Sequence, residues 1–268
     1  MEKIGIVGFG YVGQRLKRFF EYGNHYEVKI YDPTDSRSDT KEDINQSKLA
    51  VICVPTPMSE KDKSCDISIV EESISWIKSP VIWIRSTIEP GTTEYLKKKY
   101  KKRIVFSPEY LGVGNYYTPY NFHEKEEEVP YSILGGDKKD TQYIVQIIAP
   151  IMGPVKQYRQ TNAKTAEVVK YMENTFFATK VTFINEMFEI CNALGVDFYE
   201  VRDLWLLDPR INPMHTMIFE NNRGFSGKCL PKDVNGIVQA ALKAGYKPEF
   251  LLEMLKSNEK FRKKNKKE

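Results

Sequence analysis

Three glycines near the start of the chain constrain its fold more than any other feature. The segment GIVGFGYVGQRL places them at positions 8, 10 and 13, between an apolar run typical of a strand and a stretch typical of a helix. Gly8 permits a tight turn, Gly10 lets the backbone approach a pyrophosphate, and Gly13 lets the helix pack on the strand. The segment therefore predicts a phosphate-binding turn, whose other members are Phe9, Tyr11 and Val12.

A carboxylate follows at the spacing that a dinucleotide site requires. The next strand-like run, EVKIYD, ends on Asp32, 19 residues past Gly13, where an acid can bind both hydroxyls of a ribose. An acid there also repels a 2′-phosphate, so we expect NAD rather than NADP. Arg37 weakens this preference slightly and is expected beside the adenosine.

Apolar runs alternate with helix-like stretches from residue 3 to about residue 158. The runs typical of strands are residues 3–9, 27–32, 49–55, 81–86, 103–109 and 131–136. Such alternation predicts a parallel sheet with helices on both faces. A helix ended by a proline is expected over residues 138–149, and a long loop over residues 115–130.

The pattern changes after residue 160. Residues 163–194 contain no proline or glycine and carry apolar residues at helical spacing, which predicts one helix about 45 Å long. Further helices are expected at 197–207, 213–222, 231–244 and 247–264. The predicted fold class is α/β, with a Rossmann-type doubly wound sheet in residues 1–160. A long central helix and a small all-helical domain follow in residues 161–258, with a basic, disordered tail at 259–268.

Composition excludes several classes of protein. The net charge is only +4, so nothing indicates a nucleic-acid partner. No run reaches the roughly 20 apolar residues of a membrane span, and the start does not resemble a secretion signal. We therefore expect a soluble, cytoplasmic protein without a membrane partner. Its four cysteines are too scattered for a disulfide framework or a zinc site, so no metal is expected.

Several side chains occupy positions suited to chemistry, although each also has an ordinary structural interpretation. Lys170 and Asn174 are four residues apart on the predicted long helix and project from one face, as surface pairs commonly do. Glu109 ends a predicted strand at the edge where open parallel sheets bind ligands, but a carboxylate there can simply cap a helix or turn. Thr87 lies at the same edge of the preceding strand, where it can be a turn residue.

Cys229 lies in GFSGKCLPKDV, two residues before Pro231, a proline that marks the start of a helix. The thiol is expected near the positive end of this helix, with Lys228 and Lys232 alongside and Asp233 in the first turn. An exposed helix end stabilises an anion by only about 0.3 to 1 kcal/mol, so a nucleophilic thiolate would also need a neighbouring cation. In isolation, the alternative of an inert buried thiol is favoured.

Together these segments resemble the UDP-glucose/GDP-mannose 6-dehydrogenase family. The matching segments occur in the family's order and cover nearly the whole chain. They are GIVGFGYVG, CVPTP at 53–57, STIEPGTT at 86–93, SPEYL at 107–111, AEVVKYMENTFFATKVTFINE at 166–186, DPRI at 208–211 and GFSGKCLPKDV at 224–234.

The resemblance implies NAD-dependent oxidation of the C6 alcohol of a nucleotide sugar, most simply of the UDP-glucose type, to a carboxylate. Cys229 would trap the aldehyde as a thiohemiacetal and later a thioester. Glu109, Thr87 and Asp233 would serve the hydrolytic water, and Lys170 and Asn174 would hold the reacting oxygen. The implied cofactor contacts are Thr56, Ser86, Thr87 and Lys232, and the implied substrate contacts are Tyr110, Leu111, Lys170, Asn174, Arg210, Phe225 and Gly227.

The resemblance also implies a homodimer formed through the central helix, with Arg210 reaching across the interface. Three departures accompany it. The family's GFGGSC is GFSGKC here, Val113 stands where the family has an acid, and no second βαβ pattern follows residue 234. We therefore expect a short form without the C-terminal nucleotide-sugar-binding domain. The alternatives are a non-catalytic or degenerate NAD-binding member, or a dehydrogenase acting on a sugar without the nucleotide. A hydroxyacid dehydrogenase is disfavoured, because it needs no cysteine.

Overall fold

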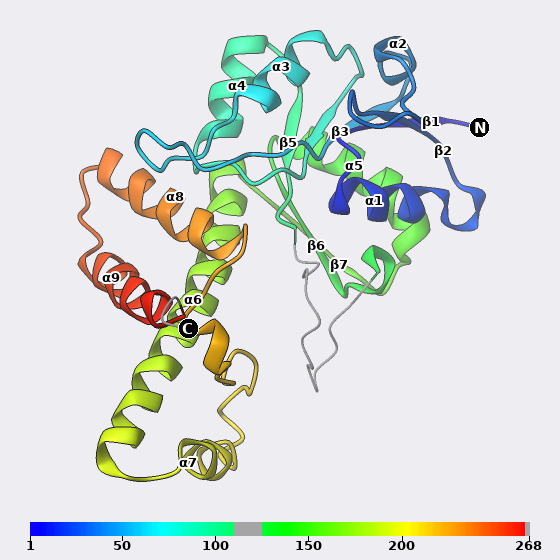
Figure 1. Cartoon of the computed structure of the whole chain (residues 1–268). Helices are drawn as coiled ribbons and strands as arrows, with labels where there is room; N and C mark the ends of the chain where they lie inside the picture. The colour runs from blue at the N-terminus through cyan, green and yellow to red at the C-terminus, as the bar shows by residue number, and fades with distance from the viewer. Residues whose placement is uncertain (110–124, 266–268) are drawn as a thin grey trace. The chain divides into compact units, whose positions relative to one another are not determined.

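The computed structural model describes residues 1–109 and 125–265 (Figure 1). Compactness divides the chain into two units. The first comprises residues 1–61 and 65–170, and the second comprises residues 62–64 and the described chain from residue 171 onward. The division falls inside the long helix, after Lys170, whereas the predicted boundary follows residue 160.

A seven-stranded sheet with the order β2-β1-β3-β4-β5-β6-β7 forms the centre of the first unit. Every neighbouring pair is parallel except β5 with β6, which is antiparallel. The strands are β1 (Lys3–Val7), β2 (Glu27–Tyr31), β3 (Leu49–Ile52), β4 (Ile82–Ile84), β5 (Ile104–Phe106), β6 (Tyr131–Gly135) and β7 (Gln157–Thr161). The predicted Rossmann-type doubly wound sheet is confirmed.

Two features of the sheet differ from the sequence prediction. The antiparallel contact of β6 departs from the all-parallel arrangement that alternation predicts. The last strand, β7, has the sequence QYRQT and no buried residue, so it carries no apolar pattern. It lies at the end of the sheet and pairs only with β6 among the described strands. A polar edge strand of this kind is invisible to hydrophobic periodicity.

Alternate residues along the strands enter two separate cores, which shows that both faces of the sheet are covered. Ile6, Val51 and Trp83 belong to one cluster with residues of α1 and α5, whereas Ile52 and Ile84 belong to the other with residues of α3 and α4. The helices of this unit are α1 (Tyr11–Glu21), α2 (Lys41–Asn45), α3 (Ser68–Trp76), α4 (Thr92–Tyr100) and α5 (Lys138–Met152), with short 3₁₀ turns at Tyr22–Asn24 and Glu126–Glu128.

Helix α5 continues through Pro150 to Met152, past the predicted end at residue 149. Ile151 and Met152 are buried in the same cluster as Ile147 and Ile148. Their burial holds the final turn in helical form although the proline supplies no N–H group.

The buried carboxylate of Glu167 joins the long helix α6 (Ala163–Leu194) to the start of α4. It accepts hydrogen bonds from Gly91 N (2.5 Å), Thr93 N (2.8 Å) and Thr93 Oγ1 (2.6 Å). Burial raises the pKa of Glu167, and these three donors oppose the rise only in part. Because Gly91 offers α4 no side-chain cap, Glu167 supplies the acceptor that the N-terminus of α4 needs.

The second unit is all-helical in its described residues, as predicted. It contains most of α6, followed by α7 (Phe198–Trp205), α8 (Leu230–Lys243) and α9 (Glu249–Lys264), with a 3₁₀ turn at Glu220–Asn222. One small core joins α6, α8 and α9 through Ala178, Phe225, Val234 and Met254. A second core joins α6 and α7 through Ile184, Cys191, Phe198 and Ile218.

The helix predicted over residues 213–222 is wrong, since only the 3₁₀ turn at Glu220–Asn222 is helical there. Pro213 O accepts a hydrogen bond from Thr216 N and closes a turn instead. His215 has a left-handed φ of 64°, and its ring stacks on Phe177 with centroids 4.6 Å apart. A tertiary contact therefore replaces the local helix, which residue spacing alone cannot indicate.

Helix α9 runs to Lys264, which confirms the helix predicted over 247–264, whereas the disorder predicted for residues 259–264 as part of the tail is wrong. Met254, Asn258 and Phe261 are buried along α9, so its apolar stripe extends into the lysine-rich segment. The charged side chains that suggested a disordered tail surround this stripe. Residues 266–268 lie outside the described residues.

We predict that Glu167→Ala lowers the free energy of unfolding by about 3 kcal/mol, because it leaves buried donors at the start of α4 without their acceptor. Urea denaturation followed by circular dichroism measures the change. The matched control is Glu94→Ala on α4, whose side chain is 54% exposed and should change stability by no more than about 0.5 kcal/mol. Equal effects of the two substitutions would contradict the role of Glu167.

Candidate functional site

The glycine turn after β1 has the geometry that its sequence predicts. Gly8 has φ of 91°, and a Cβ there would lie 2.8 Å from the carbonyl of Cys53. A Cβ on Gly13 would lie 2.2 Å from Gly8 O, whereas one on Gly10 would meet no atom within 4 Å. Gly8 and Gly13 are thus required by packing, and Gly10 leaves open space beside the backbone. The N-terminus of α1, which follows Gly10, has no side-chain cap.

Asp32 ties this turn to the end of β2. Its Oδ2 accepts a hydrogen bond from Phe9 N (2.7 Å), and its Oδ1 accepts from Thr34 N (2.9 Å) and Thr34 Oγ1 (2.7 Å). Burial acts to raise the pKa of Asp32, but these hydrogen bonds outweigh it and the pKa is lowered. The side chain is therefore an ionised acceptor beside the glycine turn, as ribose binding requires.

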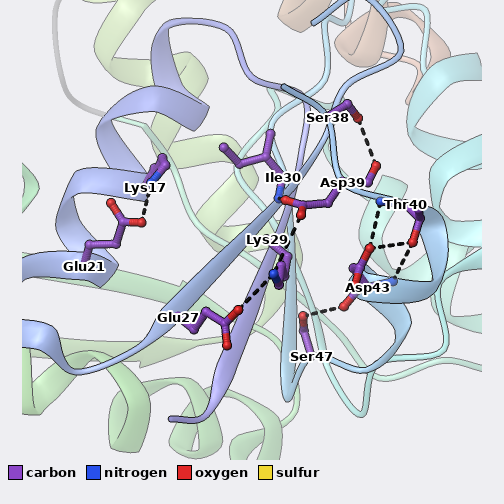
Figure 2. Close-up of polar contacts among 10 residues, drawn as sticks. All are labelled: Lys17, Glu21, Glu27, Lys29, Ile30, Ser38, Asp39, Thr40, Asp43 and Ser47. Carbon is purple, nitrogen blue, oxygen red and sulfur yellow. Dashed lines mark hydrogen bonds and ion pairs between the residues drawn. The ribbon is translucent and has the colours of Figure 1, made fainter. Parts of the chain in front are cut away.

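The loop after β2 folds back against that strand, as Figure 2 shows. Asp39 Oδ2 accepts from Ile30 N at 2.7 Å, and Asp39 N donates to Ile30 O at 2.6 Å. One aspartate therefore covers the open edge of β2, which is the first strand of the sheet. Thr40 and Asp43 then form a capping box that starts α2 (Figure 2).

Arg37 occupies this folded loop close to the glycine turn. Its guanidinium lies 5.2 Å from the centroid of the Phe9 ring and donates to Asp35 at 2.9 Å and 2.7 Å. These hydrogen bonds from Arg37 lower the pKa of Asp35 to about 2. The position of Arg37 is compatible with the predicted contact to an adenosine, which remains a prediction.

The loops that follow β3 and β4 carry the other predicted cofactor contacts. Ser86 Oγ donates to Val54 O at 2.7 Å, and Cys65 Sγ donates to Thr87 O at 3.3 Å. Thr56 and Ser86 are buried. Since β1, β3 and β4 are parallel, these loops and the glycine turn leave the same edge of the sheet, where open α/β sheets bind nucleotides. The residues of this edge therefore fit a dinucleotide.

Glu109 is held by a buried arginine that the sequence analysis did not select. Arg85 donates from one guanidinium nitrogen to Glu109 Oε2 (2.6 Å) and from the other to Glu126 Oε1 (2.8 Å). Its side chain is only 3% exposed. Burial opposes the charge of Arg85, but the two carboxylates outweigh it and the pKa of Arg85 is raised. Burial also raises the pKa of Glu126.

Lys170 lies beside the same residue, since its Nζ donates to the backbone oxygen of Glu109 at 2.5 Å. The structure therefore brings together two of the predicted catalytic residues in the first unit. A charged residue at the end of the buried run VIWIRS was the available signal for Arg85, because burying an arginine requires partners.

A second group of predicted residues surrounds Asp233 in the first turn of α8. Asp233 is buried, and its carboxylate accepts from Asn174 Nδ2 and from Lys232 Nζ, both at 2.5 Å. Its backbone N–H donates to Cys229 O at 2.9 Å. Asn174, Lys232 and Asp233 therefore form one hydrogen-bonded set next to Cys229.

Cys229 is the N-cap residue of α8 and is exposed to solvent. Its expected position at a helix start is confirmed, and the alternative of a buried thiol is wrong. Gly227, two residues earlier, has φ of 83° and open space around its Cα. Lys228 is exposed, while Lys232 is engaged by Asp233.

The remaining predicted substrate contacts are dispersed. Phe225 is buried in the core of the second unit. Arg210 is 85% exposed and pairs with Asp208 at 2.5 Å, so its predicted role across a dimer interface stays a prediction. Tyr110, Leu111 and Val113 lie outside the described residues.

Neither a metal cluster nor a membrane-spanning helix occurs among residues 1–109 and 125–265. No three His, Cys, Asp or Glu side chains there are grouped so that they could hold a metal ion. The helices of the same residues are too short or too polar to cross a bilayer.

The doubly wound sheet, the open glycine turn and Asp32 define a dinucleotide-binding α/β protein with an appended helical unit. The chain belongs to the UDP-glucose/GDP-mannose dehydrogenase family. Residues 32–148 match the family's NAD binding domain, and residues 164–260 match its central domain. NAD as the cofactor and the resemblance predicted from the sequence are thereby confirmed.

Similar proteins include two curated relatives and a solved structure. UDP-glucose 6-dehydrogenase TuaD of Bacillus subtilis is 29% identical, over 98% of this chain and 64% of the relative. UDP-N-acetyl-D-mannosamine dehydrogenase of Pyrococcus horikoshii is 32% identical, over 83% of this chain and 51% of the relative. A UDP-glucose dehydrogenase from Pyrobaculum islandicum has the same fold, with a TM-score of 0.83 at 22% identity over 97% of this chain and 68% of that one. The chain thus spans about half to two thirds of the curated relatives' length.

We predict that Gly10→Ala folds normally but weakens NAD binding by about tenfold or more, because the added methyl group fills the open space beside the turn. Gly13→Ala should instead destabilise the fold by about 2 kcal/mol or more, since its Cβ meets backbone. Isothermal calorimetry with NAD and thermal denaturation separate the two effects. Wild-type NAD affinity in Gly10→Ala would contradict the assignment of this turn.

Proposed function

We propose that this chain oxidises the C6 primary alcohol of a nucleotide sugar to a carboxylate with NAD, and that the sugar nucleotide is of the UDP-glucose type. The observation that carries the proposal is the exposed Cys229 at the start of α8, next to the Asp233, Asn174 and Lys232 set. The names of the relatives, which act on UDP-glucose and on UDP-N-acetyl-D-mannosamine, support this substrate class.

Converting an alcohol to an acid places three demands on a protein. The aldehyde must be retained, the charge on its oxygen must be stabilised, and a water must later be activated. A thiol, an ammonium with an amide, and a carboxylate with a hydroxyl meet these demands in turn. The proposal assigns these roles to Cys229, to Lys170 with Asn174, and to Glu109 with Thr87.

NAD, when bound, accepts one hydride in each of two oxidations. Between them, the Cys229 sulfur bonds to the aldehyde carbon to give a thiohemiacetal, whose oxygen is held by Lys170 and Asn174. The second oxidation leaves a thioester on Cys229. Water then adds to its carbonyl carbon, the carbon–sulfur bond breaks, and the acid leaves while the thiol recovers its proton. Asp233 assists this hydrolysis, and Arg85 keeps the Glu109 carboxylate in place.

The glycine turn and its neighbours are proposed to hold the cofactor. Asp32 would bind the ribose, Arg37 would lie beside the adenosine, and the backbone from Gly8 to Gly13 would face the pyrophosphate. Thr56, Ser86, Thr87 and Lys232 are the further proposed contacts. Tyr110, Leu111, Arg210, Phe225 and Gly227 remain the proposed contacts of the sugar nucleotide, with Lys170 and Asn174.

We predict two NADH per substrate molecule when the protein is supplied with its sugar nucleotide, measured with a panel of UDP-, GDP- and dTDP-sugars. Cys229→Ser should lower kcat by about 1,000-fold or more, because it removes the covalent hold on the aldehyde. Cys191→Ala is the matched control, since Cys191 is buried in the α6–α7 core and should leave the stoichiometry unchanged.

Absence of turnover with every sugar nucleotide would contradict the proposed reaction, and one NADH per substrate would contradict the thioester step. The competing function is a non-catalytic NAD-binding protein, which Lys228 beside the thiol favours. It predicts normal NAD affinity, together with alkylation of Cys229 no faster than that of a cysteine in an unstructured peptide.

We also propose a homodimer formed through α6. The second-unit part of this helix exposes large apolar side chains, including Met172, Phe176, Phe183 and Leu194, and exposed apolar surface of this extent favours association. Sedimentation equilibrium should give the mass of a dimer. A monomer at micromolar concentration would contradict this proposal and the role of Arg210.

A further inference from the structure

Asn258 of α9 and Asn265, the C-cap residue of this helix, bind the backbone of the segment that leads into the Cys229 loop. Asn258 Oδ1 accepts from Phe225 N (2.7 Å), and its Nδ2 donates to Phe225 O (3.1 Å). Asn265 repeats the same pairing two residues earlier, accepting from Arg223 N (2.8 Å) and donating to Arg223 O (3.0 Å). Each amide thus satisfies one backbone donor and one backbone acceptor.

The spacing of the two asparagines explains how both reach one segment. Asn258 lies in α9 and Asn265 is its C-cap residue, seven residues later, which is close to two helical turns, so they share one face. Arg223 has extended backbone angles, with φ of −68° and ψ of 143°, whereas Gly224 has a left-handed φ of 73°. Asn258 and Asn265 therefore satisfy the backbone groups of the residues on either side of this turn.

Two side chains of α6 also bind this segment. Asn185 Oδ1 accepts from Arg223 Nε (2.7 Å) and from Gly224 N (3.2 Å). Glu189 Oε1 accepts from a terminal nitrogen of Arg223 (2.8 Å). Gly224 has φ of 73°, and a Cβ there would lie 2.5 Å from Asn258 Oδ1. Residues 223–225 are therefore fixed at backbone level by two helices of the second unit.

Along the chain, the Cys229 thiol lies between the hydrogen-bonded residues 223–225 and the hydrogen-bonded Asp233. Gly227, Lys228 and Cys229 are exposed, and a Cβ on Gly227 would meet no atom of the described residues within 4 Å. The next anchor is Asp233, which Asn174 and Lys232 hold in α8. The place of the thiol is therefore set by how firmly its two ends are held.

We propose that Asn258 and Asn265 are positioning residues that fix the entry to the Cys229 loop and so determine where the thiol lies. The catalytic consequence of this inference rests on the proposed function. A misplacement of about 1 Å at a reacting group can cost about 100-fold in rate. The carboxyl-terminal half of α9 is then part of the site's framework.

The test replaces each asparagine by its isosteric acid, Asn258→Asp and Asn265→Asp, which removes the amide donor and turns a carboxylate toward a backbone carbonyl. Hydrogen–deuterium exchange of residues 223–225, whose N–H groups are hydrogen-bonded in the wild type, should accelerate by about tenfold in either variant, in line with the loss of one or two hydrogen bonds. With a sugar nucleotide that is turned over, kcat should fall by about 10- to 100-fold, while the KM for NAD is unchanged.

Two controls separate positioning from a general loss of stability. Ile218→Ala weakens the α6–α7 core of the same unit without changing a residue that binds residues 223–225. Its exchange is compared with that of Asn258→Asp after correction for the difference in their thermal midpoints. Glu253→Gln changes an exposed residue of α9 that pairs with Lys256. Neither control should accelerate exchange at residues 223–225 by more than its effect on global unfolding.

Exchange at residues 223–225 that is no faster in Asn258→Asp and Asn265→Asp than in Ile218→Ala would overturn the inference. Faster exchange with an unchanged kcat in an active protein would also overturn it. If the wild type oxidises no sugar nucleotide, the proposed function fails, whereas the exchange measurement still decides whether the asparagines hold the loop.

Discussion

The buried hydrogen bonds of Glu167 are the interaction on which the candidate groups of the first unit depend. This carboxylate of α6 binds the first turn of α4, and Lys170 follows one turn later on the same helix and reaches the backbone of Glu109. Further along, α6 supplies Asn174 to Asp233 and Asn185 to the segment before Cys229. Within the first unit α6 therefore contacts α4 and Glu109, and within the second unit it contacts Asp233 and the segment before Cys229.

The candidate carboxylates are held in place by hydrogen bonds, whereas the candidate nucleophile is exposed. Glu109 is held by Arg85, and Asp233 by Asn174 and Lys232. Cys229 itself is exposed at a helix start. Ionisable groups that are buried cost free energy unless they are paired, and here each has a partner that also fixes its direction. In the second unit the sulfur is open to solvent while Asp233 beside it is held in place.

The parts of the site that the sequence predicts correctly depend on local backbone geometry. Gly8, Gly13, Asp32 and the proline after Cys229 specify turns and helix starts through their own conformational limits, and the structure has them as predicted. The polar strand β7 and the turn at His215 depend on contacts far along the chain, so periodicity misassigns them. Asn258 and Asn265 were missed for the same reason, because their roles exist only once distant segments are packed together, whereas the charge of Arg85 at the end of a buried run was a local signal.

The most direct test of the central claim is the mass of the Cys229-containing peptide after incubation with NAD and a panel of nucleotide sugars, followed by rapid acid quenching. The covalent role of Cys229 predicts a peptide heavier by one sugar nucleotide at the thioester level, absent without NAD and absent in Cys229→Ser. An unmodified Cys229 peptide in a reaction that produces NADH would contradict it.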